Sequence, residues 1–505
     1  MAKTSQNHPE FTDFYLPFGG RLNSENRWLK LAEVTPWDVI EECYRESLTE
    51  GKIGAPSYSS RVAYGALIIQ EQKGLTDVEV VNEIFESPYL QAFLGYKELL
   101  KSSPFDSSLM VHFRKRFTQE HHDKINRVVI KEGTPSNSEN SDQQDPPSHG
   151  GKLMIDATCT PADISYPTDL KLLNGAREHS EKLIDWLHQH TPAVGKKPRT
   201  YRRVARKDYL NVAKQKKAGA KKIRKGLKKQ LDYLKRNLKS LSGLIAKGDG
   251  VKLFTNAQLK IYYVIQHLYE QQQEMYRNKV NRCSDRIVSI TQPHVRPIVR
   301  GKTGVSVEFG AKISISHQAN GFVTIERLSW DNYNECNDLE EQVENYKKQF
   351  GVLPESIHAD QIYHTRENRS YCKRHGIRLS AKPLGRPKKE TEQNKAELKA
   401  EKDLRQQDYR DRNAVEGAFG VLKRKGSLSQ IMAKLPRTSE SVIHVAVLVM
   451  NLRKRLKEAL RTSFWRTQKS ALESYFITLF EELLKGLQRV NFHIFTLNKG
   501  VSLFQ

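Results

Sequence analysis

The sequence is poor in cysteine, and the cysteines it has are scattered. Its 505 residues include five, and no two of them stand at C-x-x-C spacing. They are Cys43, Cys159, Cys283, Cys336 and Cys372. An odd, dispersed set argues against a zinc knuckle or a disulfide framework and fits a reducing cytosol. We expect most of these thiols to be packing residues.

Long apolar runs and several common catalytic motifs are also missing. No run of eighteen apolar residues occurs, so no membrane-spanning helix is expected. The first residues, MAKTSQNHPEFTDFY, lack the apolar core of a secretion signal. Neither the G-x-x-x-x-G-K-[ST] phosphate loop nor the H-E-x-x-H zinc motif is present. These absences argue against nucleotide hydrolysis and predict a cytoplasmic protein.

Acidic residues are outnumbered by basic ones. Lys and Arg number 83 against 58 Asp and Glu, which gives a formal net charge of +25 and a pI near 9.6. Most of the excess lies in residues 196–239, where 19 basic residues face two acids, Asp208 and Asp232. This balance indicates a polyanionic partner, with nucleic acid first and an anionic membrane surface as the rival. We expect double-stranded DNA and no membrane partner.

Composition divides the chain into four predicted parts. Residues 1–131 show helical spacing of apolar residues and predict an all-helical N-terminal DNA-binding domain. Residues 132–150, EGTPSNSENSDQQDPPSHG, are polar and predict a disordered linker. Residues 151–460 predict an α/β domain with a basic helical insertion at about 178–290. Residues 461–505 predict a C-terminal helical segment of open role.

The α/β domain is predicted to hold a mixed five-stranded sheet. A buried strand at 153–155 ends at Asp156, and the helical insertion follows it. From residue 304 onward apolar and polar residues alternate in GVSVEFG, KISISH and FVTIERLSW. This alternation predicts consecutive antiparallel strands. A later strand ends at Asp360, and alternating helices and strands follow.

The insertion carries an apolar seam beneath its basic residues. Seven apolar residues are spaced by 4, 4, 3, 4, 3 and 4: Ile223, Leu227, Leu231, Leu234, Leu238, Leu241 and Ile245. This heptad pattern and a second helical stretch at about 254–277 predict a helical hairpin. The basic face, including Arg202, Arg203, Lys221 and Lys222, is expected to follow a phosphate backbone. The seam would serve that hairpin or a contact between two copies of the chain.

Three acids form the predicted catalytic centre. Asp156 and Asp360 end two strands that can be neighbours, and Glu416 lies on a helix after the sheet. Three hard oxygen ligands at one point suit Mg²⁺ or Mn²⁺, and two ions can share them. Such a site activates a water or a 3′-hydroxyl for phosphodiester displacement.

The stretch RQQDYRDRNAVEGAFGVLKRKG at 405–426 puts four functional side chains on one stripe. Tyr409, Arg412, Glu416 and Lys423 stand at offsets of 0, 3, 7 and 14, so a helix turning about 100° per residue aligns them. The same spacing also fits a solvated face with helix-spaced ion pairs.

These residues resemble a known family. The pattern Tyr409–x2–Arg412–x3–Glu416–x6–Lys423 resembles the Tyr-Arg-Glu-Lys signature of bacterial insertion-sequence transposases of the DDE class. IDATCTPADISYPTDLKLLNGARE and HADQIYHTRENRSYCKRHGI resemble the segments around that family's two Asp residues. YGALIIQEQKGLTDVEVVNEIFESPYLQAFLG resembles its helical N-terminal domain.

The resemblance implies an RNase H-like core and a cut-and-paste reaction. Asp156, Asp360 and Glu416 would hold two Mg²⁺ or Mn²⁺ ions, and Tyr409, Arg412 and Lys423 would contact DNA phosphates. The partners implied are transposon ends and target DNA, bound by a homodimer or higher homo-oligomer in the bacterial nucleoid.

Weaker features and alternative functions complete the predictions. Arg114, Lys115 and Arg116 form a basic cluster at the end of a predicted short helix, where they suit DNA contact. GRPKK at 385–389 would place Arg386 in a minor groove. One alternative is an RNase H-like nuclease that cuts without joining. The other is a basic DNA-binding repressor without chemistry.

Overall fold

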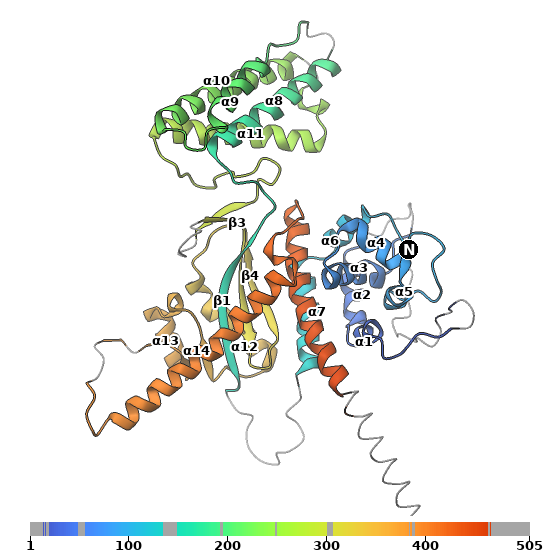
Figure 1. The fold of residues 1–505 in the computed structure, drawn as a ribbon, viewed down its shortest axis with the longest axis vertical. Helices are drawn as coiled ribbons and strands as arrows, with labels where there is room; N and C mark the ends of the chain where they lie inside the picture. The colour runs from blue at the N-terminus through green and yellow to red at the C-terminus, as the bar shows by residue number, and fades with distance from the viewer. Residues whose placement is uncertain are drawn as a thin grey trace, which may run out of the picture.

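The computed structural model consists of an N-terminal group of helices, a central sheet with helices on both faces, and a helical insertion that stands beyond one end of the sheet (Figure 1). It describes residues 14, 16, 20–48, 56–134, 149–191, 195–247, 250–299, 307–382, 384–385, 389–462 and 465. The predicted linker lies mostly outside these residues, as does Arg386.

Seven helices form the described part of the N-terminal region, as the apolar spacing predicts. They are α1 (Arg27–Glu33), α2 (Trp37–Glu46), α3 (Ser60–Lys73), α4 (Asp77–Glu86), α5 (Pro88–Phe93), α6 (Leu109–Arg116) and α7 (Gln119–Gly133). Helix α4 begins at a capping box, in which Thr76 and Glu79 satisfy each other's backbone N–H groups. Helix α3 is buried over most of its length and is the centre of this region's core.

The sheet contains six strands: β1 (Lys152–Pro161), β2 (Arg296–Val299), β3 (Val307–Gln318), β4 (Val323–Ser329), β5 (Ser356–His358) and β6 (Arg378–Leu379). Its order is β2-β3-β1-β5-β6, and β4 also pairs with β3. Strands β2 and β4 pair with different parts of β3, so the six strands make a sheet that is five strands wide. The pairing is antiparallel between β1 and β3 and parallel between β1 and β5.

Helices cover the two faces of this sheet. Helix α14 (Lys395–Arg424) buries Val415, Phe419 and Leu422 against one face, and the unlabelled helix over 436–462 shares that core. The other face carries α12 (Leu339–Phe350) and α13 (Arg366–Arg374). Short 3-10 turns η5 (Glu335–Asp338), η6 (Gln361–Tyr363) and η7 (Ser427–Ser429) connect these elements.

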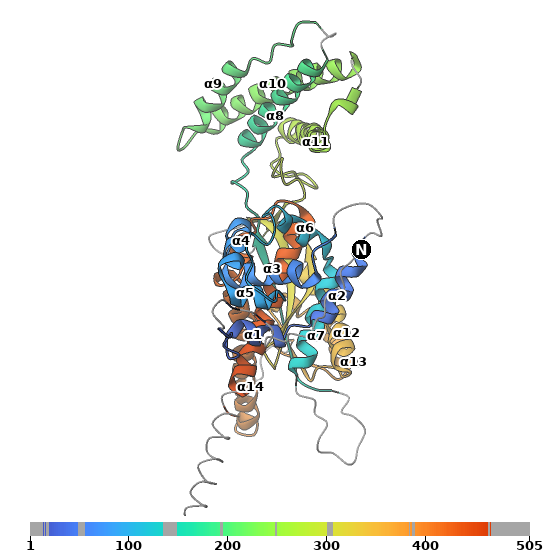
Figure 2. The same ribbon diagram turned by 90° about the vertical axis from the view of Figure 1, so that its right-hand side faces the viewer.

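The insertion leaves β1 at its C-terminal end and returns at β2. It comprises α8 (Asp169–His190), α9 (Arg202–Ala213), α10 (Ala220–Lys247), η4 (Gly250–Leu253) and α11 (Asn256–Asn278). In both views it lies past the end of the sheet, joined to it by two connecting segments (Figures 1 and 2). The heptad seam packs inside this insertion, because Leu231, Leu234 and Leu241 are buried in a core with residues of α8 and α11.

The helix over 436–462 joins the sheet to the N-terminal helices. Val445, Leu448 and Val449 belong to the N-terminal core, and other residues of the same helix belong to the sheet core. Across this junction the His444 ring stacks on that of His122, with centroids 5.5 Å apart. The N-terminal helices therefore share their core with a segment more than 300 residues away in the sequence.

The predicted fold class is confirmed: an α/β protein with a mixed sheet, a helical insertion after the first strand and a helical N-terminal region. Two details were wrong. Strand β1 does not end at Asp156 but continues to Pro161. GVSVEFG and KISISH are not two strands, because β3 runs through Gly310, whose missing side chain lets the Thr160 carbonyl approach closely.

Within the described residues, no helix is long and apolar enough to span a membrane.

Candidate active site

Asp156 and Asp360 lie side by side because their strands are parallel neighbours. Met154 of β1 pairs with His358 of β5. Asp156 follows Met154 by two residues, and Asp360 follows His358 by two residues. Both acids therefore stand at the same level of the sheet. Asp360 leaves β5 as the cap of η6, and its carboxylate accepts a hydrogen bond from the Gln361 N–H. The two predicted strand acids are thus brought together.

Helix α14 brings Glu416 to the same place through Arg412. One guanidinium nitrogen of Arg412 lies 3.1 Å from an Asp360 carboxylate oxygen. Another lies 3.0 Å from a Glu416 carboxylate oxygen. The Arg412 side chain is 20% exposed, whereas Asp360 and Glu416 are 58% and 56% exposed. A single cationic group therefore spans two of the three predicted metal ligands, which both remain open to solvent.

The third carboxylate, Asp156, is electrostatically unfavourable in its ionised form. Burial raises the pKa of Asp156 to about 6, although the Ala157 N–H donates to its oxygen and lowers the pKa. The negative charges of Asp360 and Glu335 raise the pKa further, and Arg412 lowers it. A carboxylate crowded by like charges gains from a bound cation. This donor set of hard oxygens fits Mg²⁺ or Mn²⁺.

Three contacts fix α14 across the sheet. Arg378 of β6 forms two 2.8 Å hydrogen bonds with Asp408, and Lys152 of β1 lies 2.7 Å from Asp411. Nearer the end of α14, the Lys423 ammonium donates to the Thr158 hydroxyl at 3.0 Å. Because these anchors come from β1 and β6, the register of α14 on the sheet is set on both sides of Glu416.

His358, Asp408 and Asp411 form a cluster with metal-ligand spacing, their ligand atoms lying within 4.8 Å of one another in the described part of the chain. Both acids of this cluster already pair with a protein cation, Arg378 or Lys152. Their charge is therefore compensated, and we assign the cluster to the attachment of α14.

The remaining members of the predicted stripe differ in exposure. Tyr409 is 62% exposed, and the Arg412 guanidinium lies 5.9 Å from its ring centroid. Lys423 is half-buried against β1. Tyr409, Arg412 and Glu416 thus share one solvent-facing side of α14, while Lys423 reaches back to the strand that carries Asp156.

The basic cluster of α6 is mostly occupied by contacts within the protein. Arg114 is 6% exposed and binds Asp77 and Gln70. Arg116 lies over the Tyr44 ring and donates to the Ser47 carbonyl, while Lys115 is exposed. Of the three residues predicted to bind DNA, Lys115 is the one whose charge faces solvent.

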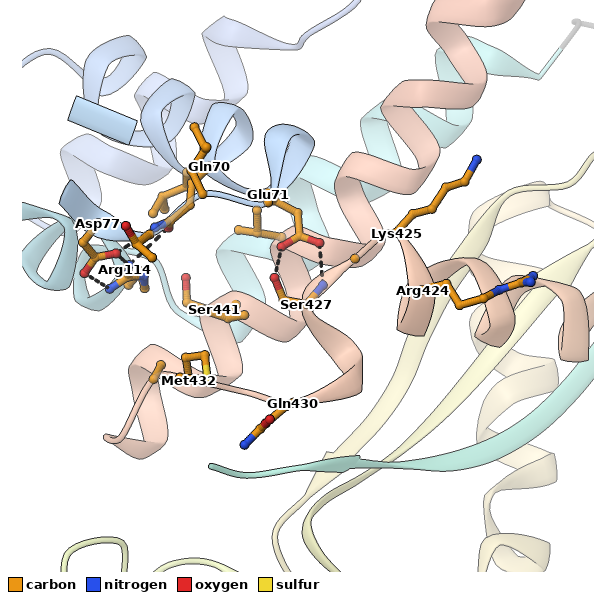
Figure 3. A pocket seen from close by; sticks show the side chains of 18 residues that line it. Gln70, Glu71, Asp77, Arg114, Arg424, Lys425, Ser427, Gln430, Met432 and Ser441 are labelled. Carbon is orange, nitrogen blue, oxygen red and sulfur yellow. Dashed lines mark hydrogen bonds and ion pairs between the residues drawn. The ribbon is translucent and has the colours of Figure 1, made fainter. Parts of the chain in front are cut away.

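Arg114 lines a pocket of about 510 Å³ where the N-terminal helices meet the end of α14 (Figure 3). Glu71 of α3 accepts a 3.0 Å hydrogen bond from the Ser427 N–H across this junction. Arg424 and Lys425 extend away from the N-terminal helices in this view. The polar groups on the Glu71 side hold the two regions together, and the two cations face outward.

The insertion displays its cations to solvent. All 19 Lys and Arg residues of 196–239 are exposed, including the predicted contacts Arg202, Arg203, Lys221 and Lys222. Arg202 also pairs with Asp185 at 2.8 Å. The ring of Tyr201 lies between two guanidinium groups, 4.6 Å from that of Arg199 and 4.7 Å from that of Arg236.

Sequence reasoning missed Glu335, Lys312 and Tyr363. Glu335 acts on the pKa of Asp156 and forms a 2.8 Å ion pair with Lys312. Tyr363, three residues after Asp360, is completely buried. No motif marks these residues, and the one available signal is that Tyr363 lies inside the second-Asp segment, HADQIYHTRENRSYCKRHGI.

Two parts of the chain match families of known proteins. Residues 357–453 match a family described as transposase DDE domain, and residues 17–116 match one described as transposase domain (DUF772). The two matches support a bacterial insertion-sequence transposase of the DDE class. The first match includes Asp360 and Glu416, and Asp156 lies before it.

One relative of this chain comes from Rhizobium meliloti. It is described as "Uncharacterized protein ORF8 in nfe locus" and is 25% identical over 165 residues, which are 32% of this chain and 76% of that protein. No solved structure matches the chain.

Proposed function

We propose that this transposase binds the inverted-repeat ends of its insertion sequence, hydrolyses phosphodiester bonds there and joins the freed 3′-hydroxyl to target DNA. The observation that carries the proposal is that the β1–β5 register sets Asp156 and Asp360 at one level of the sheet, while Arg412 links Asp360 to Glu416. The strand order β3-β1-β5-β6 with α14 across it supports an RNase H-like core.

The three carboxylates are the residues that would hold the metal. A pair of Mg²⁺ or Mn²⁺ ions at this point supplies an activated water or 3′-hydroxyl and stabilises the leaving oxygen. Asp156 and Asp360 are held at fixed separation by the pairing of β1 with β5. Glu416 is placed by the anchors of α14, and its exposure leaves it accessible to a DNA strand.

Cationic side chains around the acids suit the binding of the scissile strand. Arg412 presents a planar fork that matches a phosphate, and Lys423 adds a point charge near Asp156. Tyr409 offers an exposed ring and hydroxyl one turn before Arg412. These residues would orient the phosphodiester over the carboxylates.

The insertion and the N-terminal helices supply the wider DNA surface in this proposal. The insertion's exposed cations would contact phosphates without reading sequence, so their contribution would fall with salt. Lys115 is the α6 residue we retain for DNA contact, and we leave Arg114 out because it is buried in its pair with Asp77. Pairing of two ends would require two or more copies of the chain.

Incubation of the wild-type protein with a labelled duplex from the element's end, a target plasmid and Mg²⁺ or Mn²⁺ tests the proposal. Metal-dependent nicks together with joined products are expected. Nicks without joining would indicate the nuclease alternative. Tight binding without any metal-dependent product would indicate a DNA-binding repressor.

A further inference from the structure

A fourth carboxylate, that of Glu335, lies close enough to Asp156 to raise the pKa of that residue. Glu335 belongs to η5, between β4 and α12, and its side chain is 17% exposed. Its oxygen lies 2.8 Å from the ammonium of Lys312, a β3 residue that pairs with Cys159 of β1. Cys159 follows Asp156 by three residues on the same strand. Glu335 is therefore held beside β3, at the register position of Cys159 in the neighbouring strand β1.

An amide ties this carboxylate's segment to the segment of Asp360. The Asn368 side chain of α13 donates to the Cys336 carbonyl at 2.8 Å and to the Tyr363 carbonyl at 2.9 Å. Cys336 follows Glu335 directly, and Tyr363 ends the turn that begins after Asp360. The two turns η5 and η6 thus form one unit next to the strand acids.

The hydroxyl of Tyr363 lies within this unit. Tyr363 is 0% exposed, and no side chain or backbone group in the described part of the chain makes a hydrogen bond with its hydroxyl. Burial raises the pKa of the Tyr363 hydroxyl, and the negative charges of Glu335 and Asp156 raise this pKa further. An unpaired buried hydroxyl is destabilising, so a polar partner here would offset that penalty.

We propose that Glu335 and the Tyr363 hydroxyl bind the water shell of the metal at Asp156 and Asp360, on the sheet face opposite Glu416. Mg²⁺ keeps several of its waters when bound to proteins, so carboxylates beyond its direct ligands still contribute. Both residues are positioning residues that act through water. The inference rests on the proposed metal-dependent function, but metal affinity can be measured without any DNA reaction.

Calorimetric titration of the full-length protein with Mg²⁺ and with Mn²⁺ tests this assignment. Outer partners of metal ligands typically contribute about 10- to 100-fold in affinity, so Glu335→Gln is expected to bind at least tenfold more weakly. Glu341→Gln, an exposed acid of α12, is the matched control and should bind as wild type does. Wild-type affinity in Glu335→Gln would overturn the proposal.

Tyr363→Phe separates ligand binding from packing. Removing an unpaired buried hydroxyl leaves the free energy of unfolding unchanged or higher if the residue merely fills space. Under the proposal the same change lowers metal affinity several-fold while the protein stays as stable as wild type. Unchanged metal affinity in this variant would remove the hydroxyl from the site.

The double variant Lys312→Met, Glu335→Gln controls for the ion pair. Glu335→Gln alone leaves Lys312 buried without its carboxylate, so part of any effect could come from lost stability. The double variant should recover stability and still bind metal weakly. Recovery of metal affinity together with stability would show that Glu335 acts through Lys312 and would contradict the proposal.

Failure of this inference differs from failure of the proposed function. A wild-type protein that binds metal but makes no cut refutes the transposase reaction and leaves the roles of Glu335 and Tyr363 measurable. A wild-type protein that cuts, with both variants showing wild-type metal affinity, refutes the inference alone. A wild-type protein that binds no metal, even with DNA bound, overturns both.

Discussion

The acidic site and the basic insertion are organised in opposite ways. At the site, three carboxylates are positioned by strand register and by helix anchors, and a single arginine spans two of them. In the insertion, 19 cations are all exposed. Lys197, Arg202 and Lys229 pair with acids, while the other sixteen form no ion pair with any residue the structure describes. Chemistry here needs exact placement, whereas backbone binding needs charge density.

The comparison predicts that the two regions can be disabled separately. Asp360→Asn should lower cleavage by about a thousandfold, because metal ligation supplies several kcal/mol and each 1.4 kcal/mol is tenfold in rate. DNA affinity of the same variant should stay within about twofold of wild type. Single-turnover cleavage and a parallel binding titration check this. Joint loss of both properties would place Asp360 in the DNA-binding surface instead.

A smaller effect is expected from neutralising the insertion. Lys221→Gln with Lys222→Gln should reduce the salt slope of DNA binding by about 2, since each phosphate contact contributes roughly 0.9. Affinity should fall roughly ten- to a hundredfold at about 0.1 M salt, while cleavage at saturating DNA persists.

Lys347→Gln with Lys348→Gln is the matched control for that pair. These two lysines are also adjacent and exposed, but they lie on α12. Their replacement should leave the salt slope unchanged. Equal losses from both pairs would show that general charge, rather than the insertion surface, determines binding.

Arg412 pairs with two proposed metal ligands and is also a proposed DNA contact. Its removal should therefore change metal affinity and DNA affinity in opposite directions. Arg412→Gln frees Asp360 and Glu416, so Mg²⁺ affinity without DNA should rise roughly two- to thirtyfold, given two exposed ion pairs of 0.2–1 kcal/mol each. DNA affinity should fall by a similar factor. Arg410→Gln, on the same helix, is the control. A fall in both affinities would contradict a competition between metal and arginine.

Asp156 provides an effect of another kind, on the pH dependence of stability. Because its pKa is about 6 in the folded protein, above the ordinary 3.8, the folded state binds more protons and stability falls as pH rises between these values. Asp156→Asn should therefore raise the free energy of unfolding by about 1–3 kcal/mol at pH 8 in a chelator. The gain should vanish below pH 4. Denaturant unfolding at both pH values measures it, with Asp331→Asn as an exposed control.

Sequence patterns predicted those features whose cause is local or periodic. The heptad seam identified α10, and Leu231, Leu234 and Leu241 are buried as expected. Leu227 and Leu238 are partly buried, and Ile223 at the start of the seam is exposed. The spacing from Tyr409 to Lys423 identified α14, which runs unbroken through Gly417 and Gly420 because its apolar face packs on the sheet. The two Asp segments were expected on neighbouring strands, and they are paired.

Features that depend on distant contacts could not be predicted. Asp156 is mid-strand because β3 pairs with β1 on both sides of it. Arg114 is buried because Asp77, 37 residues away, folds against it. Glu335 approaches Asp156 through a salt bridge and an amide link that leave no periodic mark in the sequence.

The central claim is that α14 supplies the third metal ligand to the two strand acids. Its most direct test is cleavage of a labelled element end by wild type and by Glu416→Gln across a range of Mg²⁺ concentrations, with DNA binding measured in parallel. We predict metal-dependent nicks from wild type, almost none from the variant, and equal DNA affinity. Equal cleavage by both proteins would contradict the account, because Glu416 would then be a surface residue of α14.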